Sequence, residues 1–280
     1  VFTYFHFAAS KKLTEALRLS GAHALAFETV MDREGRLPCL IPMSEIAGRM
    51  SVQEGAKCLE KVSNGRGILL AGVPGVRPAD VVIVGGGVVG ANAAKMAAGL
   101  GARVTVLDTN LNRLRYLDDI LPANVIKVYS SPEALAPALK EADLVVGAVL
   151  KEGAPASKVI TRAMVRAMKP GAAIVDVSID QGGCCETSRP TTHSSPTFTE
   201  EGVVHYCVTN MPGGVARSST QALSNATLPY ALRLAGSGLK KAFLEDPGLA
   251  HGLNLSRGFV THPAVAAWLG EELTPWQGLV

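Results

Sequence analysis

A glycine-rich turn at residues 85–90 constrains the fold of this chain more than any other feature. Its sequence, Gly-Gly-Gly-Val-Val-Gly, fits the pattern G-x-G-x-x-G. An apolar, strand-like run precedes it at residues 81–84. Residues 91–100 favour a helix, and Gly101 suits the position just after that helix. Strand, glycine turn and helix in this order form the arrangement in which the pattern binds the phosphates of a dinucleotide.

Each glycine of the motif has its own physical role. Gly85 permits the tight turn, Gly87 lets a pyrophosphate approach the backbone, and Gly90 lets the helix pack closely on the strand. The N-terminus of the helix then directs its unpaired N–H groups at the phosphate charge. We expect a Rossmann-type dinucleotide site here, and the alternative is a glycine-rich turn that binds nothing.

An acidic residue stands where such a site needs one. Asp108 ends the next apolar run, roughly 20 residues beyond the glycines. A carboxylate at this position can accept hydrogen bonds from both hydroxyls of the adenosine ribose and would repel a 2′-phosphate. The sequence therefore favours NAD as the cofactor, while Arg113 and Arg115 nearby keep NADP open as an alternative.

Apolar runs alternate with helix-forming segments through the middle of the chain. Because most of these runs are continuously apolar, they are typical of a parallel sheet covered on both faces. We predict an α/β fold, a doubly wound parallel-sheet Rossmann domain with a second, incomplete α/β substrate domain. The expected strands are residues 81–84, 103–107, 125–128, 144–148, 173–179 and 203–208.

The second domain is expected to come from the two ends of the chain. Residues 1–42 are interpreted as a remnant of the substrate domain, and residues 217–280 as a return helix with the C-terminal part of that domain. Residues 43–216 form the expected NAD-binding domain together with a connecting helix. Because the sequence starts at Val1 without an initiator Met, we expect it to be a truncated portion of a longer enzyme.

Helical spacing and turn residues predict several elements outside the glycine motif. A helix is expected at residues 8–19, followed by a strand at 24–30. The connecting helix is expected at residues 43–62 with Ser44 as its N-cap. A further Ala- and Leu-rich helix is expected at residues 218–234.

Composition and charge narrow the class of partner. The net charge is only +3, and no run of basic residues interleaves with aromatic ones, which argues against a nucleic acid or a membrane surface as partner. The longest apolar stretch is interrupted by Lys95 and Arg103, so no membrane segment is expected. The five cysteines are odd in number and form no C-x-x-C pair, which favours a reducing, cytoplasmic location.

Histidine and cysteine spacing gives no support for a metal site. His205 and Cys207 lie on one expected strand, and Cys184, Cys185 and His193 have no recognised ligand spacing, so core and loop roles are expected for them. The chain also lacks a G-x-S-x-G elbow, which argues against a serine hydrolase.

Several short segments together resemble the alanine dehydrogenases of the alanine dehydrogenase/nicotinamide nucleotide transhydrogenase family. The resemblance extends along nearly the whole chain. Its segments are residues 2–6 (FTYFH), 42–48 (PMSEIAG), 72–76 (GVPGV), 179–183 (IDQGG), 188–192 (SRPTT) and 210–212 (NMP).

The resemblance implies NAD-dependent oxidative deamination of L-alanine to pyruvate and ammonia, with reductive amination as the reverse, in a homohexamer. It also implies a substrate carboxylate held by an Arg and a Lys upstream of the catalytic histidine, and these have no counterparts in this sequence. The alternative from a different class is an NAD-binding module of the transhydrogenase type, without amino-acid turnover of its own.

Two residues match the catalytic positions of the family, His6 and Asp180. An imidazole with a pKa of ~6.5 suits proton exchange with an amine or a carbinolamine near neutrality. Asp180 follows an expected strand at its carboxyl end, where ligands of open α/β sheets bind, and could orient water or support an imidazolium. Without the resemblance, a packed core histidine and an N-cap or loop aspartate are the alternatives.

The remaining cofactor positions are carried by the resemblance alone. They are expected around the phosphates, the adenosine and the nicotinamide half, in addition to Gly85, Gly87, Gly90 and Asp108. These positions are Ser44, Val88, Val89, Arg113, Ser130, Val149, Leu150, Val177, Ser178, Ile179, Asp180, Arg189, Val208, Thr209, Asn210 and Met211.

Overall fold

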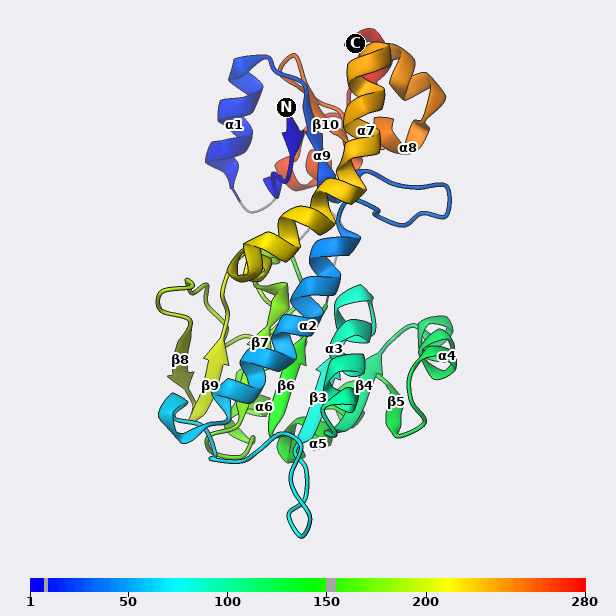
Figure 1. Ribbon diagram of the computed structural model, residues 1–280. Helices are drawn as coiled ribbons and strands as arrows, with labels where there is room; N and C mark the ends of the chain where they lie inside the picture. The colour runs from blue at the N-terminus through cyan, green and yellow to red at the C-terminus, as the bar shows by residue number, and fades with distance from the viewer. Residues whose placement is uncertain (8–9, 150–154) are drawn as a thin grey trace. The chain divides into compact units, whose positions relative to one another are not determined.

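The computed structural model describes residues 1–7, 10–149 and 155–280 (Figure 1). The described chain forms two compact units. We call Val1–Met43 with Val215–Val280 the terminal unit, and Ser44–Leu150 with Ala156–Gly214 the central unit. The glycine-rich turn lies in the central unit.

The central unit is built on a seven-stranded sheet in the order β5-β4-β3-β6-β7-β9-β8. Neighbouring strands run parallel except β8 and β9, which are antiparallel. The parallel α/β Rossmann fold predicted from the sequence is therefore confirmed. The strands are β3 (Asp80–Val84), β4 (Arg103–Asp108), β5 (Val125–Tyr129), β6 (Leu144–Gly147), β7 (Ala173–Asp176), β8 (Thr197–Glu200) and β9 (Val203–Tyr206).

The order of the strands reverses beside β3. The chain runs outward from β3 to β4 and β5, and then returns to add β6 on the other side of β3. Ligands of open parallel sheets bind at the carboxyl ends of strands flanking such a reversal, because the connecting helices there diverge to opposite faces. The glycine-rich turn follows β3, which is one of those two strands.

Helices cover both faces of this sheet (Figure 1). They are α2 (Ile41–Cys58), α3 (Val88–Gly99), α4 (Leu111–Ile120), α5 (Pro132–Glu141) and α6 (Arg162–Arg166). On one face, Leu139 of α5 packs in a cluster with Val82 and Val145. On the other, a Cβ on Gly55 of α2 would lie 2.6 Å from Leu144, so that helix approaches β6 closely.

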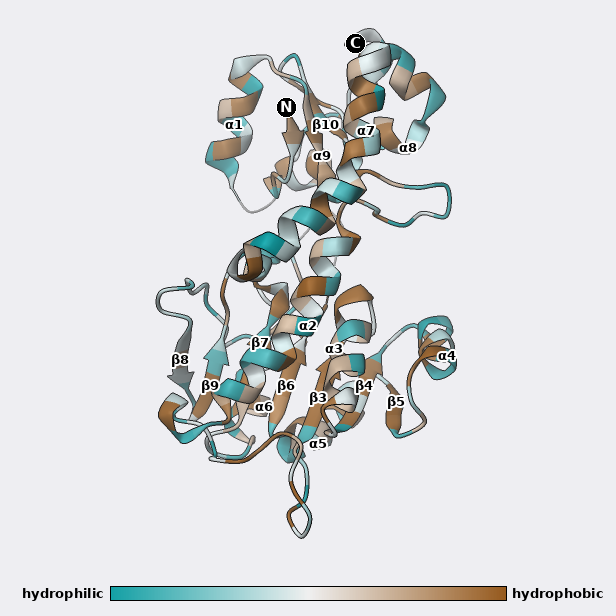
Figure 2. Cartoon of the chain, viewed as in Figure 1, coloured by the Kyte–Doolittle hydropathy of each residue, from teal (hydrophilic) through white to brown (hydrophobic). Residues whose placement is uncertain are grey.

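The strands themselves are apolar, as Figure 2 shows for β3, β4 and β6. Residues 144–147 are all buried, and so are residues 81–84. A strand buried on both faces loses the alternation of polar and apolar residues that a half-exposed strand keeps. This is the physical reason why the continuous apolar runs predicted a parallel sheet correctly.

The terminal unit has a small sheet of its own, in the order β1-β2-β10-β11. Strand β1 is parallel to β2, whereas β10 is antiparallel to both β2 and β11. The strands are β1 (Phe2–Thr3), β2 (Ala24–Ala26), β10 (Leu253–Ser256) and β11 (Phe259–Val260). The helices are α1 (Lys11–Ser20), α7 (Ala216–Glu245), α8 (Pro247–His251) and α9 (Pro263–Leu269).

Several predicted element boundaries are wrong. Ser44 is not an N-cap, because α2 already begins at Ile41 and tolerates Pro42 in its first turn. The strand expected at residues 173–179 ends at Asp176, whose carboxylate accepts the N–H of Ser178 and opens the 3₁₀ turn η4 (Val177–Gln181). The strand expected at residues 24–30 ends at Ala26, where the 3₁₀ turn η2 (Phe27–Thr29) begins.

Among the helices that the structure describes, none is both long enough and apolar enough to cross a membrane.

Candidate active site

The glycine-rich turn is so tightly packed that two of its glycines admit no side chain. A Cβ on Gly85, which has a φ of 103°, would lie 2.4 Å from the carbonyl oxygen of Ala148. A Cβ on Gly90 would lie 1.8 Å from the carbonyl oxygen of Gly85, so α3 rests directly on the turn. Both distances are far below van der Waals contact, and the neighbouring atoms belong to the backbone. The predicted roles of these glycines in turn and packing follow from this geometry.

Gly87 differs, because no protein atom lies within 4 Å of the position its Cβ would take. It is the N-cap of α3, and no side chain caps that end of the helix. A helix N-terminus carries partial positive charge and unpaired N–H groups. Open space beside such an end suits a phosphate group, whose oxygens accept those hydrogen bonds.

Asp108 lies against the same turn. One carboxylate oxygen accepts the N–H of Gly86 at 2.6 Å, and the other accepts the N–H of Asn110 at 2.7 Å. The carboxylate is only partly buried, and each oxygen has a second lone pair with which it can accept a ligand hydroxyl. The backbone N–H of Ser130 donates to the carbonyl oxygen of Asp108 at 2.9 Å, which brings Ser130 beside it.

Arg113 holds the other side of the turn. Its Nε donates to the carbonyl oxygen of Gly86, and its Nη2 donates to that of Gly87 at 3.0 Å. The guanidinium also lies over the ring of Tyr116, 4.8 Å from the ring centroid. A carboxylate and a guanidinium therefore both contact the glycine-rich turn.

The predicted cofactor positions gather at the carboxyl edge of the central sheet. Gly85 follows β3 directly, Asp108 ends β4, Ser130 follows β5, Val149 lies just beyond β6, and Val177 follows β7. Residues 208–211 come shortly after β9. Because carboxyl ends of parallel strands meet at one edge, these positions share that edge although they are far apart in sequence. The predicted position Leu150 lies outside the described residues.

Several other predicted cofactor positions have side chains with little exposed surface. Ser178, Ile179, Val208 and Met211 are buried. Ser44 lies one turn before Gly48 of α2, where a Cβ would come within 2.3 Å of the carbonyl oxygen of Val89. That close approach joins α2 to the first turn of α3.

Asp180 lies in η4, immediately after β7. Its Oδ1 accepts the backbone N–H of Asn210 at 3.0 Å. Asn210 has a φ of 49°, a left-handed conformation that asparagine tolerates better than most residues. The bond therefore links the loop after β7 to the loop after β9, with a partly exposed carboxylate between them.

Asp176 is a functional candidate that the sequence reasoning missed. Its carboxylate is fully buried and accepts backbone N–H groups from Ser178 at 3.1 Å, Cys184 at 2.9 Å and Cys185 at 3.1 Å. These bonds close the loop that carries Asp180. An acidic residue at the end of an apolar strand could have pointed to Asp176, but the expected strand at residues 173–179 ran past this position.

Lys158 reinforces the same loop, and it was also missed. Its ammonium donates to the carbonyl oxygens of Gly182 at 2.5 Å and Cys185 at 3.1 Å. The loop after η4 is thus held from one side by a buried carboxylate and from the other by a lysine.

Arg189 is exposed and rests on an aromatic ring. Its guanidinium carbon lies 4.1 Å from the ring centroid of Phe198, and that ring stacks on His205 with centroids 4.9 Å apart. His205 is fully buried, accepts or donates a bond to Thr187 at 2.7 Å, and donates through Nδ1 to the carbonyl oxygen of Val203 at 2.9 Å. Burial lowers the pKa of His205.

The thiols around this region are also core groups. All five cysteines are buried and unpaired by disulfides. Burial raises the pKa of Cys184, with the charge of Asp176 adding to the effect, and burial raises the pKa of Cys207 to about 12. No group of three or more potential metal ligands occurs in residues 1–7, 10–149 and 155–280.

His6 lies in the terminal unit, just after β1. Its φ is 48°, and its backbone N–H donates to Glu28 at 2.7 Å. The ring of Tyr4 is parallel to the imidazole within 6°, with centroids 5.9 Å apart. His6 is partly exposed, and its assignment as a catalytic residue stays a prediction.

A parallel sheet with a glycine turn at its reversal point, and an acid ending the next strand, defines a Rossmann-type dinucleotide-binding protein. The glycine cradle, the open space at Gly87 and the charges of Asp108 and Arg113 fit such a cofactor. A family profile described as "Alanine dehydrogenase/PNT, C-terminal domain" matches residues 51–263. The chain belongs to this alanine dehydrogenase/PNT family.

Individual relatives agree with the family. An alanine dehydrogenase of Halomonas elongata is 56% identical over 280 residues, covering 100% of this chain and 76% of the relative. One of Bacillus subtilis is 55% identical over 277 residues, covering 98% and 73%. A solved structure of L-alanine dehydrogenase has a TM-score of 0.88 at 51% identity, covering 96% of this chain and 74% of that one.

These findings confirm the predicted enzyme class, an oxidoreductase that uses a nicotinamide cofactor. A transhydrogenase structure from Sinorhizobium meliloti has a TM-score of 0.76 at 20% identity and covers 93% of this chain and 75% of that one. At this identity the likeness concerns the fold alone. The transhydrogenase-type alternative therefore has weaker support than the dehydrogenase.

Proposed function

We propose that this chain catalyses the NAD-dependent oxidative deamination of L-alanine to pyruvate and ammonia, and the reverse reductive amination. The observation that carries the proposal is Asp180, a partly exposed carboxylate at the sheet edge that also bears the glycine turn and Asp108. A module that only binds a nucleotide has no need of such a group. Relatives that are 50% to 56% identical and bear the name alanine dehydrogenase support the same reaction.

The proposed cofactor is NAD rather than NADP. Asp108 would hydrogen-bond the ribose hydroxyls of the adenosine and repel a 2′-phosphate, while the first turn of α3 would hold the pyrophosphate. When bound, the oxidised nicotinamide supplies the acceptor for the hydride lost from the substrate Cα. The other proposed contacts are the positions named above from the resemblance, including Ser44, Ser130 and Arg189.

In the proposed chemistry the protein's own residues handle protons and water. Loss of hydride from Cα and of a proton from the amine gives the imine of pyruvate. Asp180 would orient the water that attacks the imine carbon. His6 would accept a proton from that water and pass it to the nitrogen, which gives the carbinolamine. A second proton, taken by His6 from the carbinolamine hydroxyl and passed to the nitrogen, would then expel ammonia and leave the ketone of pyruvate.

The test is a screen of cofactors against amino acids with the purified enzyme, following the absorbance of the reduced nicotinamide. We expect reduction of NAD with L-alanine, a much slower reaction with NADP, and weak turnover of larger amino acids. Tight NAD binding without turnover of any amino acid would contradict the proposal and favour the transhydrogenase-type module.

We also propose a cytoplasmic homo-oligomer, a hexamer by resemblance to the family. The five buried, unpaired thiols suit a reducing compartment. Light scattering of the purified enzyme after size-exclusion chromatography measures the assembly, and a monomeric mass would contradict it.

A further inference from the structure

His6 has a backbone conformation that needs support. Its φ of 48° lies in the left-handed region, which residues with a Cβ rarely adopt. The adjacent residues, Phe5 and Phe7, are not glycines, so no flexible neighbour accounts for this backbone conformation. Strained backbone persists where surrounding contacts over-determine it, and it often marks functional sites. Something in the terminal unit must hold this turn.

Glu28 provides that support. Its Oε1 accepts the backbone N–H of His6 at 2.7 Å and that of Phe5 at 3.1 Å, and its Oε2 lies 3.4 Å from the same Phe5 nitrogen. Two successive N–H groups thus converge on one carboxylate, as in backbone nests that bind anions. Bonds to a charged acceptor are stronger than neutral ones. Glu28 makes no contact of this kind with the imidazole, so it acts on the backbone of His6.

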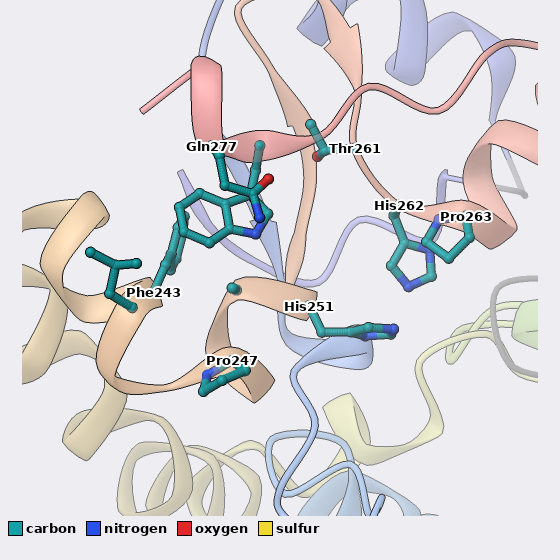
Figure 3. A pocket seen from close by; sticks show the side chains of 10 residues that line it. Phe243, Pro247, His251, Thr261, His262, Pro263 and Gln277 are labelled. Carbon is teal, nitrogen blue, oxygen red and sulfur yellow. The ribbon is translucent and has the colours of Figure 1, made fainter.

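The turn that carries Glu28 is itself anchored. Glu28 lies in η2, and the next residue, Thr29, is buried. His251 donates through Nδ1 to the carbonyl oxygen of Thr29 at 2.9 Å, and Asn254 donates to its Oγ1 at 2.7 Å. Figure 3 shows His251 beside His262, on the wall of a pocket formed by the C-terminal part of the chain. The turn that carries Glu28 is therefore held by residues of α8 and β10.

Aromatic rings fix the other side of the turn. Phe27 contacts the ring of Tyr4 edge to face, with centroids 5.2 Å apart. The hydroxyl of Tyr4 donates to the carbonyl oxygen of Cys39 at 2.6 Å, and the same ring faces the imidazole of His6. The backbone turn and the ring of Tyr4 are thus two contacts that place the imidazole.

We propose that Glu28 is a positioning residue for His6, which sets the direction of the imidazole by clamping the backbone N–H groups of Phe5 and His6. The inference rests on the proposed function, in which His6 carries the proton. Without the clamp, the peptide at His6 would relax toward an extended conformation and displace the imidazole. Catalytic groups that move by about 1 Å lose up to ~10²-fold in rate.

Three substitutions of Glu28 separate this role from general stability. Glu28→Ala removes both acceptors. Glu28→Gln keeps Oε1 as a neutral acceptor for both N–H groups, since both bonds go to that atom. Glu28→Asp keeps the charge but is one methylene too short. The matched control is Glu34→Ala, an exposed acid a few residues on that pairs with Arg36.

We expect Glu28→Ala to lower kcat for alanine oxidation about 10- to 100-fold, with the Kd for NADH unchanged. Glu28→Gln should recover most of kcat, Glu28→Asp should stay low, and Glu34→Ala should match the wild type. Amide hydrogen exchange gives a readout independent of turnover. Exchange of the Phe5 and His6 amides should accelerate in Glu28→Ala and Glu28→Asp, and stay slow in Glu28→Gln.

The outcomes distinguish the two proposals. A wild-type enzyme that oxidises no alanine overturns the proposed function, whereas protected Phe5 and His6 amides in Glu28→Ala overturn the clamp. A wild-type kcat in Glu28→Ala overturns the positioning role even if alanine is the substrate. If Glu28→Ala does not fold, the contrast between Glu28→Gln and Glu28→Asp decides, and equal kcat in those two overturns the inference.

Discussion

Asp180 has one carboxylate oxygen engaged by the backbone N–H of Asn210. An asparagine at position 180 can keep this bond through its own carbonyl oxygen, so Asp180→Asn should leave the loop in place while removing the charge. We expect kcat to fall about 10²- to 10⁴-fold, the range of acid–base assistance by one group. The Kd for NADH, measured by fluorescence titration, should stay near the wild-type value. Turnover like that of the wild type would remove Asp180 from catalysis.

Asp108 serves both the turn and the proposed ribose contact. In Asp108→Asn the amide can accept only one of the two N–H bonds from Gly86 and Asn110, and the repulsion of a 2′-phosphate is lost. The ratio of kcat/KM for NAD to that for NADP should fall at least about tenfold, or ~1.4 kcal/mol. Asp118→Asn is the control, because that side chain is 71% exposed and pairs with Lys127. An unchanged ratio in Asp108→Asn would contradict the assignment.

At the scale of single residues, the sequence names candidates only where a motif or a family pattern points to them. Gly85, Gly90 and Asp108 have the packing and contacts that the motif implies, whereas Asp176 and Glu28 were not predicted. A carboxylate that accepts backbone N–H groups from other loop residues, as Asp176 and Glu28 do, has no local sequence pattern, because its partners are decided by tertiary folding. Their roles become visible only when the loops are seen closed around them.

At the scale of elements, α3 offers a matched pair of glycines. Gly90 has backbone atoms where a Cβ would lie, whereas Gly99 in the last turn of the same helix has nothing within 4 Å. Gly90→Ala should destabilise the central unit by about 1–3 kcal/mol and abolish dinucleotide binding. Gly99→Ala should stabilise it by about 0.5–1 kcal/mol, because alanine favours a helix.

Urea unfolding in the presence and absence of NADH measures both variants. Both variants replace glycine by alanine in the same helix, so the difference between their free energies of unfolding reports the packing of α3 on the glycine-rich turn. Similar stabilities in both variants would show that α3 does not rest on the glycines.

The presence of the strands and helices was predicted better than the residues at which they begin and end. All six expected strands of the central sheet exist, since continuous apolar runs mark strands buried on both faces. Strand β8 was missed because its sequence, Thr197–Glu200, is half-exposed and polar at the sheet edge. The start of α2 was predicted too late, because Pro42 and Ser44 were interpreted as residues that precede a helix. Proline also fits the first turn of a helix, and α2 begins at Ile41.

For the whole molecule, His262 makes stability depend on pH. It is 2% exposed, and neither ring nitrogen has a hydrogen-bond partner. Burial, with a smaller effect of His251, lowers its pKa from 6.5 to about 4. Below pH 6.5 the His262 side chain of the unfolded chain takes up a proton, whereas that of the folded chain does not. The contribution of His262 to the free energy of unfolding is therefore fully present above pH 6.5 and is lost as the pH falls toward 4. The loss should approach roughly 3 kcal/mol.

Urea unfolding across this pH range measures the effect. His262→Leu should flatten the dependence, since leucine does not titrate and leaves no polar atom unpaired. His193→Asn, a change at an exposed histidine, should leave the slope as in the wild type. A slope in His262→Leu equal to that of the wild type would assign the dependence to other groups.

The pairing of Leu25 with Leu253 in the terminal sheet carries a consequence for biosynthesis. All residues up to Leu253 must leave the ribosome before β10 can join β2, and closing so long a loop is slow because of its entropy. The central sheet consists of strands close in sequence, so it can form while translation continues. We therefore expect a nascent chain to acquire its nucleotide cradle early. The turn of His6, whose support reaches to His251 and Asn254, would mature only after those two residues have been synthesised.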